Sequence, residues 1–156
     1  MARSRINAKG RRAAGSFAAL PHIVMDSEDF RCLSGSAMKV LMCLLRQYTG
    51  KNNGDLSASY KDAKSWGIGS KSTLTRALEE LQERNLIQQT REGRFLNPGG
   101  QCALYELTWQ ARDECNGKID APATNTPLRK FSLERAKNPA QKLYPERTES
   151  VPKGGH

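Results

Sequence analysis

Apolar side chains recur at helical spacing in two stretches of this chain, and each stretch predicts an amphipathic helix. The first stripe, at i, i+3, i+4, i+7, i+8 and i+11, consists of Ala37, Val40, Leu41, Leu44, Leu45 and Tyr48. Its helix is expected to open at Ser34 and to end at Gly50. The second stripe consists of Leu74, Ala77, Leu78 and Leu81. Ser70 is placed to cap that helix and Asn85 to end it.

A shorter helix is expected just before the second stripe, so that two helices are joined by a tight turn. Ser59 can accept a free amide of the first turn of the shorter helix. Ala63 is small enough to let a neighbouring helix cross closely. Gly67 and Gly69 bracket the turn, where glycine adopts positive φ without steric cost. Residues 57–81 are therefore predicted to form a helix-turn-helix pair.

Alternating apolar and polar residues after the second helix predict a β-hairpin. Its strands are expected at residues 86–92 and 101–109, with a loop at 93–100 that contains glycine and proline. One face of the second strand carries Ala103, Tyr105, Leu107 and Trp109. A very short strand is also expected at residues 56–58, ahead of the helix pair.

The two ends of the chain lack this periodicity. Residues 1–16 combine five cations with glycine and serine, so they are expected to be a disordered arm. Residues 111–156 contain five prolines and are expected to be a mostly disordered tail, with one short helix at 133–137. The fold class predicted for residues 17–110 is α+β, mainly α with a small β-hairpin.

The segment that leads into this domain is expected to be extended, because Pro21 interrupts the apolar residues 17–25. One short helical turn should follow at 26–30. Ser27 is placed to cap that turn, and the acidic residues after it lie near the positive pole of the helix.

The outward face of the second helix of the pair changes in charge along its length. Ser72 and Arg76 point opposite the apolar stripe, and Thr73 and Thr75 flank it. The later turns carry Glu79, Glu80 and Glu83. A helix that enters a DNA groove by its N-terminal end keeps acidic residues away from phosphate, and its dipole favours phosphate there. The pattern fits a recognition helix; the alternative is a helical hairpin with a solvated polar face.

The charge of the chain is concentrated at its ends. The net charge is +9, yet residues 17–110 carry 11 basic and 10 acidic side chains. Residues 1–16 carry five basic and no acidic side chains, and residues 111–156 carry nine basic and six acidic. Basic arms on a nearly neutral domain suit a polyanion such as nucleic acid. The alternative is that these arms only keep the chain soluble.

No grouping of residues predicts catalysis, a metal site or a cofactor. The cysteines are isolated, without a CxxC pair, at Cys32, Cys43, Cys102 and Cys115. This spacing argues against zinc and fits free thiols in a reducing cytosol. Because the sequence shows neither a signal peptide nor an apolar run of about 20 residues, we expect a cytoplasmic protein that is not an enzyme.

The predicted order of elements resembles that of the winged helix-turn-helix proteins of phages, plasmids and integrated mobile elements. The likeness covers residues 17–109. It is carried by Leu20-Pro21-His22, Leu33-Ser34-Gly35-Ser36-Ala37, Asn52-Asn53-Gly54-Asp55-Leu56, Gly69-Ser70-Lys71-Ser72-Thr73-Leu74, Ala77-Leu78, Leu81, Leu86-Ile87, Thr90-Arg91 and Ala103-Leu104-Tyr105-Glu106-Leu107-Thr108-Trp109. The turn is one residue longer here than in the commoner pattern, and the extra residue, Gly69, is expected to tilt the second helix.

The resemblance implies sequence-specific binding of double-stranded DNA, as a transcriptional regulator or a replication accessory protein. The second helix would enter the major groove, where Arg76 pairs with guanine and hydroxyls bond base edges or phosphates. Arg91 and Arg94 would place the hairpin loop on the backbone or in the minor groove, although Arg94 can also be a solvated loop charge. The implied DNA contacts are Lys61, Lys64, Ser70, Lys71, Ser72, Thr73, Thr75, Arg76, Arg91 and Arg94, with Arg3, Arg5, Lys9, Arg11 and Arg12 of the arm.

Two alternatives concern single side chains. Arg76 can pair with Glu79 or Glu80 along its own helix instead of contacting DNA. Trp66 and Trp109 are expected to anchor packing and not to stack on bases, since large aromatic side chains are mostly buried.

Other functions stay open as well. A winged-helix fold can serve as a protein-interaction module, and its basic arms would then bind nucleic acid without sequence preference. A second copy of the chain is a possible partner, because a two-fold DNA site requires a dimer. Residues 111–156 are a further possible site for a protein partner.

Overall fold

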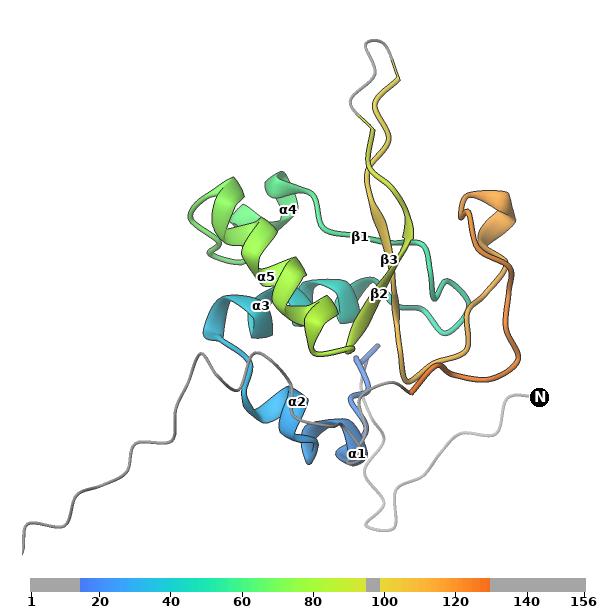
Figure 1. Cartoon of the computed structure of the whole chain (residues 1–156), viewed down its shortest axis with the longest axis horizontal. Coiled ribbons are helices and arrows are strands. Elements are labelled where there is room, and N and C mark those ends of the chain that lie inside the picture. The colour runs from blue at the N-terminus through green and yellow to red at the C-terminus, as the bar shows by residue number, and fades with distance from the viewer. Residues whose placement is uncertain (1–14, 95–98, 130–156) are drawn as a thin grey trace, which may run out of the picture.

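The computed structural model describes residues 15–94 and 99–129, which form five α-helices, a short 3-10 helix and a three-stranded antiparallel sheet (Figure 1). The predicted α+β class is therefore confirmed, and the arrangement is compatible with a winged helix. The five arm cations, from Arg3 to Arg12, and the helix predicted at 133–137 lie outside the described residues.

Most elements follow the order predicted from the sequence. They are α1 (His22–Met25), α2 (Glu28–Arg31), α3 (Gly35–Gln47), β1 (Leu56–Ser57), α4 (Tyr60–Ser65), α5 (Lys71–Glu83), β2 (Ile87–Arg91), β3 (Leu104–Leu107) and the 3-10 helix η1 (Cys115–Gly117). Four predicted caps are confirmed, because each side chain accepts the amide N–H three residues later. These caps are Ser27, Ser34, Ser59 and Ser70.

The prediction of an extended lead-in is wrong for its second half, which forms α1. Pro21 precedes this helix, and its carbonyl accepts the N–H of Val24 at 3.0 Å and of Met25 at 3.2 Å. Proline is tolerated at a helix start because the N–H that it lacks would have no helical partner there. Val24 reaches the core, whereas Ile23 stays 65% exposed.

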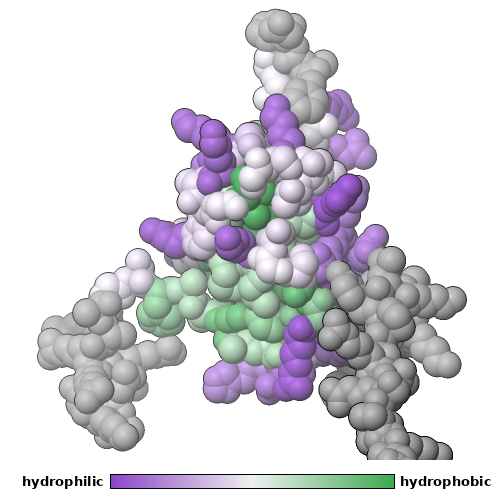
Figure 2. Space-filling model, turned by 90° about the vertical axis from the view of Figure 1, so that its left-hand side faces the viewer, coloured by the Kyte–Doolittle hydropathy of each residue, from purple (hydrophilic) through white to green (hydrophobic). Residues whose placement is uncertain are grey.

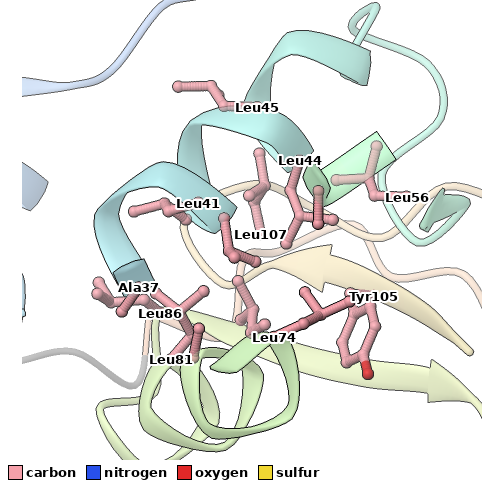
Figure 3. Close-up of a cluster of buried hydrophobic side chains, with 14 of the residues drawn as sticks. Ala37, Leu41, Leu44, Leu45, Leu56, Leu74, Leu81, Leu86, Tyr105 and Leu107 are labelled. Atoms are coloured by element: carbon pink, nitrogen blue, oxygen red, sulfur yellow. The ribbon is translucent and has the colours of Figure 1, made fainter. Parts of the chain in front are cut away.

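The core lies between α3, α5 and one face of the sheet, as Figure 3 shows. Leu41 and Leu44 of α3 are fully buried, and so is Leu81 of α5. From the sheet, Tyr105 and Leu107 join them. Both predicted apolar stripes therefore face the core, and burial of about 1.5–3 kcal/mol per large apolar side chain makes this packing the main support of α5.

β3 is the central strand of the sheet, in the order β1-β3-β2. Leu56 of β1 pairs with Tyr105, and Ile87 of β2 pairs with Leu107, both antiparallel. The β2–β3 register shifts between Gln89 and Arg91. Beyond this irregularity the β2–β3 hairpin extends away from the helices (Figure 1).

The predicted domain end at residue 110 is too early, because residues 111–129, called here the C-terminal extension, pack on the sheet. Arg112 forms a buried salt bridge with Glu106 of β3, with Nε 2.6 Å from Oε2. The N–H of Asp120 donates to the Thr90 carbonyl, and that of Arg129 donates to the Thr108 carbonyl. All four residues of β3 are consequently buried. The sequence predicted burial of only one face of this strand.

Candidate nucleic-acid interface

The turn between α4 and α5 is set by Gly67. Its φ is +86°, the left-handed conformation that ends many helices. The N–H of Gly67 donates to the Lys64 carbonyl at 3.0 Å, and that of Ile68 donates to the Ala63 carbonyl at 3.1 Å. Ala63 and Ile68 are both buried, which anchors the turn against the core. The expectation that Gly69 also needs positive φ is wrong.

Hydroxyl groups cluster at the N-terminus of α5. Ser70 Oγ accepts the N–H of Thr73 at 3.1 Å and lies 3.0 Å from Ser72 Oγ and 2.8 Å from Thr73 Oγ1. Thr75 Oγ1 donates to the Lys71 carbonyl at 3.0 Å. Ser72 and Thr75 are exposed and Thr73 is half-buried. This end of α5 therefore presents groups that donate and accept hydrogen bonds beside the positive pole of the helix dipole.

Exposed cations also lie on α4 and on the first half of α5. They are Lys61, Lys64, Lys71 and Arg76. Lys71 Nζ lies 6.0 Å from the centroid of the Tyr60 ring, within the range at which a cation is attracted to a ring face. The Tyr60 hydroxyl donates to the Gly69 carbonyl at 3.2 Å. These contacts hold the start of α4 against the start of α5, so their polar groups form one surface.

Arg76 lies on the exposed face of α5, and it forms no ion pair with any other described residue. Glu80 does not pair with Arg76, and its carboxylate instead accepts the N–H of Ser34 at 2.7 Å and the hydroxyl of Ser34 at 2.6 Å. Glu79 is exposed and likewise has no ion pair within the described chain. The guanidinium of Arg76 is thus available to a ligand, while Glu80 fastens α5 to the start of α3.

The two arginines of the β2–β3 hairpin make different contacts. Arg94 is exposed, and its backbone pairs with Gln101 through two hydrogen bonds of 2.9 and 2.8 Å. Arg91 instead donates from Nε and Nη2 to the Cys102 carbonyl and from Nη1 to the Lys118 carbonyl. Arg91 therefore binds the strand to the C-terminal extension. The sequence did not predict this use, because Lys118 is distant in the chain.

The structure brings the α4–α5 residues of the predicted site onto one surface. It also exposes Trp66, which the sequence predicted to pack in the core. Trp66, the residue that follows α4, is 39% exposed, so the prediction that it anchors packing is wrong. Trp109 is 5% exposed and belongs to the core, as predicted. An exposed tryptophan beside cations is a signal that only the tertiary structure supplies.

Other chemistry contributes little to this surface. Burial raises the pKa of the Cys43 and Cys115 thiols, which keeps them protonated and unreactive near neutral pH. Within residues 15–94 and 99–129, no group of three or more histidine, cysteine or acidic side chains is placed to hold a metal ion. In the same part of the chain, no helix has the length and apolarity needed to cross a membrane.

Comparison with known proteins supplied no relative. No family model matches the sequence, and neither the curated proteins nor the solved structures gave a significant match.

Proposed function

We propose that this chain binds double-stranded DNA sequence-specifically through a winged helix-turn-helix domain. In this proposal α4 and α5 are the helix-turn-helix pair, α5 is the recognition helix, and the β2–β3 hairpin is the wing. The observation that carries the proposal is the N-terminal half of α5, which exposes hydroxyls and Arg76, an arginine without an ion pair among the described residues. Its first residue contacts the start of α4, where lysines are also exposed. Arginine reads guanine by a bidentate contact, and hydroxyls bond base edges or phosphates.

The charge along α5 supports entry by its N-terminal end. Its first turn contains no acidic residue. Of the later glutamates, Glu80 is turned toward Ser34 and away from a DNA ligand. The net charge of +9 adds attraction to phosphate that does not depend on sequence. A role as a transcriptional regulator or replication accessory protein of a mobile element follows as part of this proposal.

The test is selection of binding sites by the full-length chain from a pool of random duplexes, repeated across a salt series. We expect one enriched motif. Arg76→Ala should lower affinity for that motif about tenfold or more, because a lost bidentate base contact costs about 1–3 kcal/mol of discrimination. The matched control is Arg31→Ala on α2, which removes the same charge from an arginine that is 66% exposed and paired with Asp26. It should leave the enriched motif unchanged.

A second candidate function is protein binding, and exposed apolar side chains near the N-terminus favour it. Phe17 is 74% exposed, Ile23 65% and Met25 42%. Exposed apolar patches often mark interaction sites. Binding to duplexes without any enriched motif, unaffected by Arg76→Ala, would support this candidate and contradict sequence-specific recognition.

A further inference from the structure

Trp66 is held partly exposed in a turn that other side chains anchor in the core. The two residues that anchor this turn in the core are Ala63 and Ile68, each 2% exposed. The indole of Trp66 remains 39% exposed. Its N–H donates to no acceptor among the described residues. The indole N–H is a donor only, so this exposed ring offers one unused hydrogen bond to a ligand.

Two lysines from different helices lie beside Trp66. Lys64 precedes it by two residues on α4 and is exposed. Lys39 of α3 reaches the next residue, since a Cβ placed on Gly67 would lie only 3.1 Å from Lys39 Nζ. Neither lysine forms an ion pair within residues 15–94 and 99–129. Asp62, one turn before Trp66 on α4, accepts a hydrogen bond from Ser59 Oγ at 2.6 Å, so two exposed lysines stand against one carboxylate in this region.

This charge favours an anionic ligand over an apolar protein surface. Among the described residues, the other large exposed apolar side chains are Phe17, Ile23 and Met25, which belong to α1 and the segment before it. Figure 2 shows hydrophilic side chains around the upper part of the face that it presents, where α4 and α5 lie, and a band of apolar side chains below that part. A partner that accepts the indole N–H near exposed ammonium groups carries acceptor oxygens with negative charge, as a phosphodiester does.

We infer that Trp66 is a further DNA-contacting residue, whose indole Nε1–H donates to a backbone phosphate beside the groove entered by α5. Lys39 and Lys64 neutralise phosphates on either side of it. This inference rests on the proposed DNA binding and extends its footprint to α3 and the end of α4. The contact positions the domain on DNA and carries no base information.

The first experiment uses fluorescence of the full-length chain with the selected duplex. The chain has two tryptophans, and Trp109 is 5% exposed, so the difference between the wild type and Trp66→Phe reports Trp66. We expect acrylamide quenching of this difference signal to fall at least about twofold on saturation with duplex, because the exposed indole becomes covered. Unchanged quenching while the duplex is bound would overturn the contact.

The second experiment separates hydrogen bonding from charge. Trp66→Phe keeps a ring but removes the donor, so it should weaken binding about tenfold while leaving the salt slope unchanged. Lys39→Ala and Lys64→Ala should each lower the salt slope by about one unit. Wild-type affinity of Trp66→Phe, with Arg76→Ala still defective, would refute the role of Trp66 and leave the proposed function standing. Failure of the wild type to bind any duplex would overturn both.

Discussion

The side-chain amide of Asn53 pairs with the main chain of Leu107 as a neighbouring strand would. Its Oδ1 accepts the N–H of Leu107 at 2.7 Å, and its Nδ2 donates to the Leu107 carbonyl at 3.0 Å. Nδ2 also donates to the carbonyls of Gln110 and Ala111. Asn53 is completely buried. One side chain thus joins the loop after α3, the end of β3 and the start of the C-terminal extension.

Replacement of this residue should strongly destabilise the fold. Asn53→Ala leaves the N–H of Leu107 without its partner and leaves the Leu107 carbonyl only the longer bond from the N–H of Gln110 at 3.3 Å. An unpaired buried polar group costs about 1–3 kcal/mol, and the bonds from Nδ2 are lost as well. We expect a loss of about 3 kcal/mol or more in the free energy of unfolding, measured by urea denaturation. The control is Asn52→Ala, whose side chain bonds Thr49 and Gln47 in a less buried place. Its loss should stay near 1 kcal/mol, and equal losses would contradict the role given to Asn53.

Removal of the C-terminal extension should unfold or severely weaken the domain. Glu106 is 1% exposed, and its carboxylate accepts hydrogen bonds from Nε and Nη2 of Arg112 at 2.6 and 2.7 Å. A chain that ends at Gln110 loses the partner of this carboxylate together with the residues that cover β3, and loss of one partner of a buried pair costs up to about 3–5 kcal/mol. A chain that ends at Arg129 keeps the pair. Thermal unfolding followed by circular dichroism compares the two, and identical melting temperatures would show that the extension adds nothing to the fold.

The two arginines of the β2–β3 hairpin should respond differently to substitution. Arg91→Ala removes three hydrogen bonds to backbone carbonyls and should lower stability by about 1 kcal/mol. Its effect on the salt dependence of DNA binding should be small. Arg94→Ala should leave stability unchanged and reduce the salt slope by about one unit if the hairpin is the wing. Filter binding across a salt series, beside urea denaturation, measures both. A reduced salt slope for Arg91→Ala without a loss of stability would indicate that Arg91 contacts DNA.

Stability should fall in alkaline solution, partly through Tyr105. Burial raises the pKa of this phenol above its ordinary value of 10.0. The folded chain therefore binds the phenolic proton more tightly than the unfolded chain does. The stabilisation is complete below about pH 10 and is lost as the pH rises through the pKa of the folded state. Tyr105→Phe has no such proton, so its free energy of unfolding should decline less between about pH 8 and about pH 11. An equally steep decline would assign the effect to Tyr48, Cys43 and Cys115, whose pKa values burial also raises.

Local chemistry determined much of this fold from the sequence alone. The stripes of α3 and α5 follow from helical spacing, and both are buried as predicted. The caps at Ser34 and Ser70 act within three residues of chain, so neighbouring residues suffice to predict them. The same holds for Asn85, whose positive φ of 53° ends α5 as expected. The exposed face of α5, with Ser72 and Arg76, was predictable for the same reason.

Only the tertiary structure decided which polar groups are used inside the fold and which face outward. Arg112 lies in a stretch without apolar periodicity, yet it covers Glu106 and extends the domain past residue 110. Arg91 and Trp66 both differ from expectation, because the carbonyls of Cys102 and Lys118 engage Arg91, while Ala63 and Ile68 are buried and Trp66 stays 39% exposed. Sequence periodicity reports which side of a helix or strand is apolar, since that depends on neighbours within a few residues. The partner of a buried charge and the exposure of an aromatic ring depend on chain segments that meet only after folding.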